Sequence, residues 1–150
     1  MEPRTVSASI TTAAPAAAIF DIVADPRQHA RIDGSGSVRD LISGPERVDL
    51  GDTFSLNMKM GIAYKITSTV VEFEEGRLIA WRHPGGHVWR YEIEAEGELN
   101  RITETFDYST VSNFRAFAYA VSGSIGRNQR SIEETLVRLA AAAEEDAVNV

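Results

Sequence analysis

Cysteine is absent from the 150-residue chain. Its absence excludes disulfide bonds, thiol nucleophiles and thiolate zinc sites, and it is natural for a protein of the reducing cytosol. Positive charge is scarce as well, because 15 lysine and arginine residues stand against 22 aspartate and glutamate residues, a formal net charge of -7. Such a balance repels phosphate backbones and anionic membrane surfaces at long range. We therefore expect no nucleic-acid partner.

Long hydrophobic runs are also missing. The most apolar segments, residues 13–23 and 136–143, are shorter than the roughly 20 residues that span a bilayer. The first residues show no basic region followed by an apolar core, which is the pattern of a secretory signal. We therefore expect a cytoplasmic protein that does not insert into membranes and that exists as a monomer or a homodimer.

The overall composition is that of a globular domain, with 43% hydrophobic and 25% charged residues. A chain of 150 residues suits one domain that buries about two-thirds of the surface of its unfolded form. The sequence shows neither an internal repeat nor a low-complexity linker. Residues 1–150 are therefore expected to form a single domain.

The first third of the chain predicts a strand and two short helices. Residues 5–12 alternate between apolar and polar side chains, which is the period of a half-buried strand. Pro15 suits the first turn of a helix that ends at Asp25-Pro26, because a proline disfavours helical angles in the residue before it. A second short helix is expected from Pro26 to about residue 32, closed by the glycine-containing loop 33–36.

The middle of the chain predicts six antiparallel strands, at about 37–43, 52–60, 63–74, 77–83, 87–96 and 101–110. Within 63–74, Tyr64 and Ile66 set one phase of alternation, whereas Val71 and Phe73 set the other. A bulge near residues 68–70 accounts for this change of phase.

The last third predicts one long helix that begins at about Asn113, because apolar residues recur there at steps of three and four. Gly123 and Gly126 interrupt it, so we expect a kink or a change of packing partner near them. An apolar stripe of Phe114, Phe117 and Val121 fits either core packing or the wall of a cavity. The element order as a whole predicts an α+β fold.

Four stretches of the sequence resemble the START-like helix-grip superfamily (SRPBCC), in particular its polyketide cyclase/dehydrase and lipid-transport branch. They are SITTAAPAAAIFDIVADPRQH, RLIAW, RITETFDYS and SIEETLVRLAAAAEE. The resemblance implies a curved seven-stranded antiparallel sheet that wraps a long C-terminal helix and leaves an apolar cavity between them. Many relatives carry a tryptophan after the Asp-Pro helix, where this chain has Ile32 and the loop 33–36, so we expect a different cavity mouth.

The stretch AWRHPGGHVWRYEI, residues 80–93, predicts a hairpin whose register decides where its two tryptophans point. A two-residue Gly-Gly turn places Trp81 and Trp89 on opposite faces, whereas a three-residue Pro-Gly-Gly loop places them on the same face. We favour the longer loop, because it gathers the apolar residues inward and sends Arg82 and Arg90 to solvent.

The candidate ligand-binding residues are the large side chains on the predicted inward faces, although the same positions also fit ordinary core packing. They are Phe54, Leu56, Met58, Met60, Tyr64, Ile79, Trp81, Trp89, Tyr91, Ile93, Phe106, Tyr108, Phe114, Phe117 and Val121.

The histidines are weaker candidates. His83 and His87 flank the predicted turn, but two imidazoles without a third ligand make a poor zinc site. We expect them at the hairpin end or at the rim of a cavity, and we expect His29 in solvent. The chain is expected to use no metal and no cofactor.

Glu104 is the most informative polar residue, because it shares a strand face with Ile102, Phe106 and Tyr108. A carboxyl group on that face enters the interior, where burial raises its pKa. Tyr91 is expected close to Glu104 across the neighbouring strand. The two residues form either a structural pair or a catalytic acid–base pair.

Three functions fit these observations. The first is a carrier or sensor that binds a small apolar molecule, such as a lipid or a polyketide, in an internal cavity. The second is an aromatase/cyclase-like or dehydratase-like enzyme in which Glu104 and Tyr91 handle protons. The third is a protein-interaction scaffold, which would show as a large exposed apolar patch.

Overall fold

The computed structural model describes residues 4–149 of the chain. Within them, seven strands form one antiparallel sheet in the order β1-β7-β6-β5-β4-β3-β2, and the helices follow in the predicted order. The elements are β1 (Thr5–Thr12), α1 (Ala16–Val23), the 3-10 turn η1 (Pro26–Gln28), α2 (His29–Ile32), β2 (Val38–Ser43), β3 (Thr53–Met60), β4 (Ile62–Glu74), β5 (Leu78–Arg82), β6 (Val88–Glu96), β7 (Leu99–Asp107), α3 (Asn113–Ser122) and α4 (Ser124–Val148).

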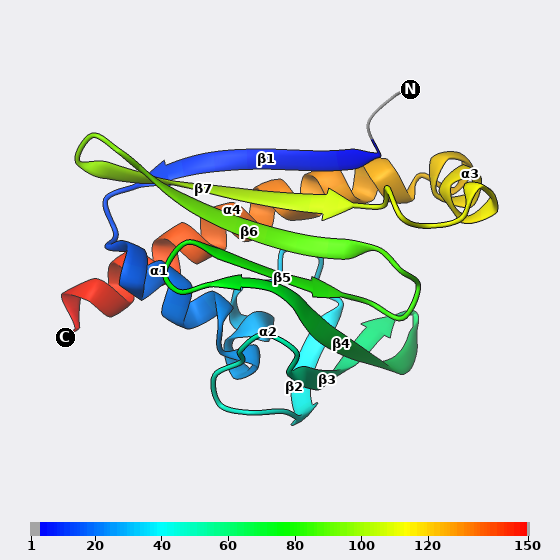
Figure 1. Cartoon of the computed structure of the whole chain (residues 1–150), viewed down its shortest axis with the longest axis horizontal. Helices are drawn as coiled ribbons and strands as arrows, with labels where there is room; N and C mark the ends of the chain where they lie inside the picture. The colour runs from blue at the N-terminus through cyan, green and yellow to red at the C-terminus, as the bar shows by residue number, and fades with distance from the viewer. Residues whose placement is uncertain (1–3, 150) are drawn as a thin grey trace.

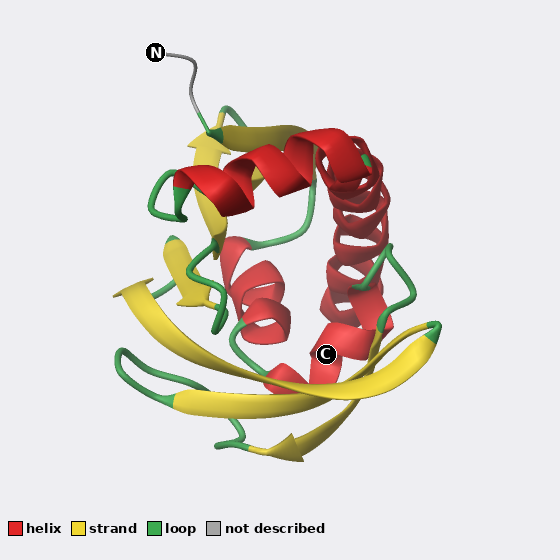
Figure 2. Ribbon diagram, turned by 90° about the vertical axis from the view of Figure 1, so that its right-hand side faces the viewer, coloured by secondary structure: helices red, strands yellow, loops and turns green. Residues whose placement is uncertain are grey.

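The sheet curves around the helices (Figure 2). The long helix α4 runs beside β1 and β7, and α1 and α2 pack against α4 from the other side (Figure 1). This arrangement confirms the predicted α+β helix-grip fold. In the described part of the chain, no helix is long and apolar enough to cross a membrane.

The short helices begin and end where proline and aspartate direct them. Pro15 precedes α1 with extended backbone angles. After α1, the Asp25 carboxylate accepts a hydrogen bond from the backbone N–H of Arg27 at 3.0 Å, and this bond starts η1. The predicted break at Asp25-Pro26 is therefore confirmed.

The strands also follow their alternation. β3 and β4 pair without interruption from Thr53–Thr69 to Met60–Ile62. The irregularity in β4 lies between Val70 and Glu72 in its pairing with β5, just beyond the predicted 68–70. A bulge at this point increases the local twist of the strand and helps the sheet to curve.

The predicted long helix is two helices, because Gly123 takes a left-handed conformation (φ 78°) between them. After this turn, α4 buries an apolar stripe that includes Ile132, Leu136, Leu139 and Ala143. In contrast, α3 buries none of its residues.

The expected inward stripe on α3 is therefore wrong. Phe114, Phe117 and Val121 are 82%, 65% and 67% exposed. The physical reason is the turn at Gly123, which directs α3 away from the sheet (Figure 1) and leaves this face without a packing partner.

Gly34 connects the loop after α2 directly to α4. Its backbone N–H donates to Thr135 Oγ1 at 2.8 Å. A Cβ atom at this position would lie 2.7 Å from Glu134 Cβ and equally close to the α4 backbone, so only glycine allows the approach. The contact fixes one wall of the space between the sheet and α4.

Candidate functional site: a cavity between the sheet and α4

A cavity of about 760 Å³ lies between the sheet and the first half of α4. Its walls come from strands β2 to β7, from α2 and the loop that follows it, and from the first half of α4. Seven of the predicted ligand-binding residues line it: Leu56, Met58, Met60, Tyr64, Trp81, Trp89 and Tyr91.

The other predicted residues lie elsewhere. Five pack within or against the hydrophobic core and are not part of the cavity lining: Phe54, Ile79, Ile93, Phe106 and Tyr108. The remaining three are the exposed α3 residues described above. The alternation identified the inward face of each strand, but the space in front of that face is filled by other side chains at some positions and open at others.

The hairpin register is the three-residue form. Trp81 pairs with Trp89, and the loop is closed by hydrogen bonds from His83 N–H to His87 O at 3.0 Å and from Gly86 N–H to His83 O at 2.9 Å. Both tryptophans line the cavity, which confirms the prediction that they share a face.

The two arginines of the hairpin point to the outer face of the sheet. Arg82 is exposed. Arg90 is half-buried between two carboxylates, Glu72 at 2.6 Å and Asp107 at 3.2 Å. Arg90 therefore joins β4, β6 and β7 on that face rather than extending into solvent.

His29 is buried, with 6% of its surface exposed, so the expectation that it is solvated is wrong. Its Nε2–H donates to the carbonyl oxygen of Val23 at 2.8 Å, and its ring stacks on Trp81 with centroids 4.8 Å apart. Because a carbonyl only accepts, Nδ1 is the unprotonated nitrogen. Burial lowers the pKa of His29 and keeps the ring neutral. The Val23 carbonyl accepts this bond at the end of α1, where the helix itself supplies no further N–H.

His83 and His87 flank the three-residue loop at the hairpin end, as expected, and both line the cavity. Their ring centroids are 4.6 Å apart, and His87 Nδ1 is 3.2 Å from the Tyr119 hydroxyl of α3. Burial lowers the pKa of His83 to about 3 and that of His87 to about 4, so both rings are neutral at pH 7. Among the described residues, no group of three or more potential metal ligands gathers around them or elsewhere.

Glu104 faces the cavity from β7, directly opposite Tyr91 on β6. It is 4% exposed, and its Oε1 has no hydrogen-bond partner among the described residues. Burial raises the pKa of Glu104 to about 8, although the Tyr91 hydroxyl, as a hydrogen-bond donor, opposes the shift. The charge of Asp33 raises it further. Burial also places the pKa of Tyr91 well above its usual value.

These groups form a polar cluster of His29, Asp33, Tyr91 and Glu104 inside an otherwise largely apolar space. Asp33 is already satisfied, because its carboxylate accepts from Ser35 and from the backbone N–H of Val38 at 2.9 Å. The free acceptor positions are therefore Glu104 Oε1 and the unprotonated nitrogen of His29. At pH 7, below the Glu104 pKa, the carboxyl is mainly protonated and can also donate.

The sequence reasoning missed the polar side of α4. Seven residues of this helix line the cavity, and four of them follow one another at helical spacing: Asn128, Ser131, Ile132 and Thr135. They extend the buried apolar stripe of α4 by about two turns, but with smaller and more polar side chains. This change along a single helical face was the signal that a cavity replaces the core there.

A curved sheet that wraps a long helix, with a cavity between them, defines a helix-grip domain. The family described as polyketide cyclase/dehydrase and lipid transport matches residues 3–144 of the chain. The chain belongs to this family.

Sequence relatives occur in Mycobacterium tuberculosis. The uncharacterized protein Rv0088 is 45% identical over 142 residues, and the uncharacterized protein MT0096 of another strain is 44% identical. The alignments cover 91% of this chain but only 63% of each relative. The chain therefore spans less than two-thirds of the length of these relatives.

Solved structures share the fold at low sequence identity. Protein Ms6760 from Mycobacterium smegmatis superposes with a TM-score of 0.69 and 19% identity, covering 93% of this chain and 92% of that one. The polyketide_cyc-like protein Cgl2372 from Corynebacterium glutamicum has a TM-score of 0.61 and 19% identity, with 97% and 94% coverage. These similarities support the fold.

Proposed function

We propose that the protein binds a small, largely apolar molecule in the cavity and acts as its carrier or sensor. The observation that carries the proposal is the cavity itself, whose volume of about 760 Å³ lies within the usual range for ligand pockets, about 300–1,000 Å³. Its walls include two methionines and two tryptophans, which give an adaptable apolar surface.

The polar cluster supports a ligand with one hydrogen-bonding group. A buried carboxyl oxygen without a partner is unfavourable, and Glu104 Oε1 is such an atom. A ligand hydroxyl or carbonyl placed there would satisfy it, while the apolar remainder of the ligand contacts Met58, Trp81 and Trp89.

A fluorescence titration with the neutral apolar probe N-phenylnaphthylamine tests the proposal. Both tryptophans of the chain line the cavity, so a bound probe is expected to quench their emission. Met58→Trp fills the cavity and is expected to weaken binding by roughly tenfold or more, because the displaced ligand loses its apolar contacts. Val137→Trp, on the exposed side of α4, is the matched control and should leave binding unchanged. The absence of quenching in the wild type would refute the proposal.

A second candidate function is proton-transfer catalysis, for which the Glu104 pKa of about 8 is the specific observation. A carboxyl with a pKa near neutrality can give and take a proton during a cyclisation or a dehydration. A linear poly-β-ketone thioester, mixed with the protein, is the appropriate test substrate. Glu104→Gln should abolish turnover and Tyr91→Phe should reduce it. Turnover that survives Glu104→Gln would exclude this role and leave the binding proposal intact.

A further inference from the structure

Large apolar side chains are exposed at one end of the molecule. On α3, Phe114, Phe117 and Val121 follow each other at steps of three and four and form one face. At the β3–β4 turn, Met60 and Ile62 are 59% and 80% exposed. A surface with this many exposed apolar side chains marks an interaction site.

The orientation of α3 is fixed by its opposite side. The Tyr119 ring packs against Phe106 and Tyr108, with centroids 6.0 Å away in each case, and its hydroxyl reaches His87. Phe117 lies about 200° around the helix from Tyr119, since successive residues of a helix are about 100° apart. The apolar face of α3 therefore points away from the body.

Six cations lie on the segments that form this end of the molecule. They are Lys59, Lys65, Arg82, Arg115, Arg127 and Arg130, and all are exposed. Within residues 4–149, no carboxylate lies at ion-pair distance from any of them. Seven other arginines do have such a carboxylate: Arg27, Arg31, Arg47, Arg77, Arg90, Arg101 and Arg138. Within the described residues the remaining two, Arg4 and Arg39, lack one as well.

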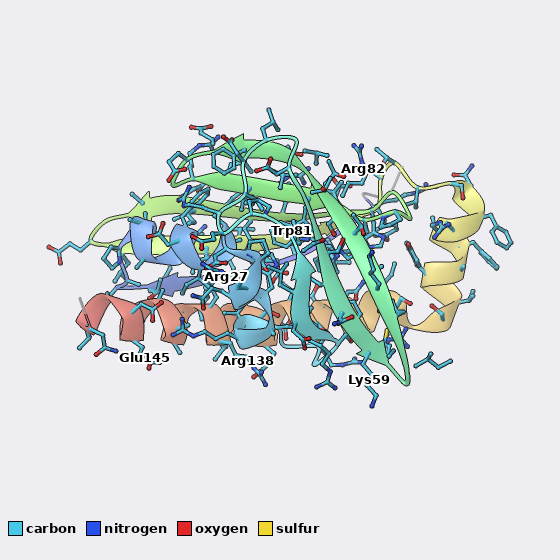
Figure 3. The ribbon with its side chains drawn as sticks, turned by 90° about the horizontal axis from the view of Figure 1, so that it is seen from below. Arg27, Lys59, Trp81, Arg82, Arg138 and Glu145 are labelled. Carbon is cyan, nitrogen blue, oxygen red and sulfur yellow. The ribbon has the colours of Figure 1, made fainter. Side chains whose placement is uncertain are left out.

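Acidic residues are absent from the same segments. None of the 22 aspartates and glutamates of the chain falls within residues 53–68, 82–89 or 110–132. The turns and helices formed by these segments gather at the end of the molecule that carries α3 (Figure 1). Figure 3 shows Lys59 and Arg82 on the α3 side of Trp81, whereas Glu145 lies at the opposite end.

The cavity is bounded by this same end, because Met60, Tyr64, Arg127 and Arg130 belong to its lining. We define the mouth face as the exposed apolar residues Met60, Ile62, Tyr64, Phe114, Phe117 and Val121 together with the six cations named above.

We propose that the mouth face docks the protein on an anionic phospholipid surface. Apolar side chains on a short amphipathic helix enter the boundary between headgroups and acyl chains, and neighbouring lysines and arginines are attracted to anionic lipid. The net charge of -7 does not prevent docking, because charges beyond about 8–10 Å are screened at physiological salt. The separation of charge along the molecule instead turns the cavity mouth toward the membrane.

A second copy of the chain is a poor occupant of this face. In a symmetric dimer the same patch meets itself, which would place six uncompensated cations opposite six more. Docking on lipid does not require that the cavity holds a ligand. The exchange of ligand between membrane and cavity, in contrast, rests on the proposed binding function.

Cosedimentation with vesicles tests the docking surface. The full chain is mixed with vesicles of phosphatidylcholine and phosphatidylglycerol in equal parts, or of phosphatidylcholine alone. We expect binding to the anionic vesicles that falls with added salt and little binding to the neutral ones. Lys59→Glu with Lys65→Glu should weaken binding by roughly tenfold or more, because each cation near an anionic surface contributes about fivefold. Phe114→Ser with Phe117→Ser should also weaken it.

Matched variants separate the face from general effects. Arg77→Glu with Arg101→Glu changes the net charge equally at the other turns of the sheet, and Leu50→Ser with Val137→Ser removes exposed apolar groups elsewhere. Both pairs should bind vesicles like the wild type. The proposal is overturned if the wild type does not bind anionic vesicles, or if the control pairs lose as much binding as the mouth-face variants. It is also overturned if ultracentrifugation shows a dimer and the double variant Phe114→Ser, Phe117→Ser dissociates it. Uptake of N-phenylnaphthylamine without vesicles tests the cavity separately.

Discussion

The two C-terminal helices, α3 and α4, are adjacent in sequence and both amphipathic, yet only α4 has a packing partner for its apolar face. The apolar side of α4 lies against the sheet and α1, with Ile132 and Leu139 completely buried. The apolar side of α3 faces outward. One glycine with a left-handed conformation separates the two outcomes. The spacing of apolar residues thus predicts an apolar face on a helix, but not whether another part of the same molecule covers that face.

The largest difference between the helices is expected in the core of α4. Leu139→Ala should lower the free energy of unfolding by about 2–5 kcal/mol, because it removes buried apolar surface and leaves a cavity. Urea denaturation monitored by circular dichroism measures the change. Val137→Ala, which is on the exposed side of α4, should shift stability by less than about 0.5 kcal/mol. Equal losses for the two variants would contradict the assigned face.

The contact between Gly34 and α4 provides the next test. Gly34→Ala should lower the free energy of unfolding by about 1–3 kcal/mol, since the new methyl group meets the α4 backbone. Gly126→Ala, where a Cβ meets only the Arg130 side chain at 3.8 Å, should instead stabilise the protein by up to about 1 kcal/mol. Thermal unfolding of both variants compares the close approach with an open helical position. If Gly34→Ala left the free energy of unfolding unchanged, the loop would not be in close contact with α4.

The pH dependence of stability tests the cost of the carboxyl buried beneath α4. The folded state holds the Glu104 proton up to a pKa of about 8, whereas the unfolded state releases it near 4.5, so stability falls as pH rises through this window. Between pH 6.5 and pH 8, Glu104 is expected to lower the free energy of unfolding by about 1–2 kcal/mol. Glu104→Gln should remove this slope.

Below pH 6.5 the two histidines of the hairpin end, His83 and His87, act in the opposite direction. Their folded-state pKa values of about 3 and about 4 lie below the usual 6.5, so the unfolded state binds protons first and stability falls as pH drops. A flat profile between pH 6.5 and pH 8 for the wild type would show that Glu104 is not held in its protonated form.

The attachment of α3 is expected to be weak. Tyr119→Phe removes the hydroxyl that lies 3.2 Å from His87 Nδ1, which should lower stability by about 0.5–1.5 kcal/mol. Hydrogen exchange measured by mass spectrometry should rise in α3 while α4 stays protected. If α3 exchanges no faster in the variant, the hydrogen bond is not what holds this helix on the hairpin.

The smallest effect is expected on the exposed side of α3. Phe117→Ala should change the free energy of unfolding by less than about 0.5 kcal/mol, because Phe117 is already 65% exposed. Urea denaturation beside Leu139→Ala gives the comparison directly. A loss above 2 kcal/mol would mean that Phe117 packs against the body.

The features that could be predicted from the sequence are those that depend on a residue and its neighbours in the chain. The break at Asp25-Pro26 and the shared face of Trp81 and Trp89 are local consequences of proline geometry and of turn length. The pairing of Glu104 with Tyr91 followed from the length of the connecting turn. These predictions needed no knowledge of the space around each strand.

Other features depended on that space and escaped prediction. His29 lies on a four-residue helix, which is too short to show a periodic face, and its inward position comes from the path of the chain around α1. The division between core and cavity depends on the curvature of the sheet and on the summed volume of the side chains in front of it. Phe106 and Trp89 are neighbours on one face, yet only Trp89 lines the open space.

The pairing of β1 with β7 has a consequence for how the chain reaches its folded state. Thr5 pairs with Asp107 and Thr12 with Asn100 in this ladder, so all seven strands must be synthesised before the first strand can pair. During synthesis, β1 therefore has no pairing partner until β7 leaves the ribosome, and it has no covering helix until α4 follows. Contacts between such distant segments slow folding and prolong the exposure of a free sheet edge. While it forms, the fold therefore depends on the first strand being kept from pairing with other chains.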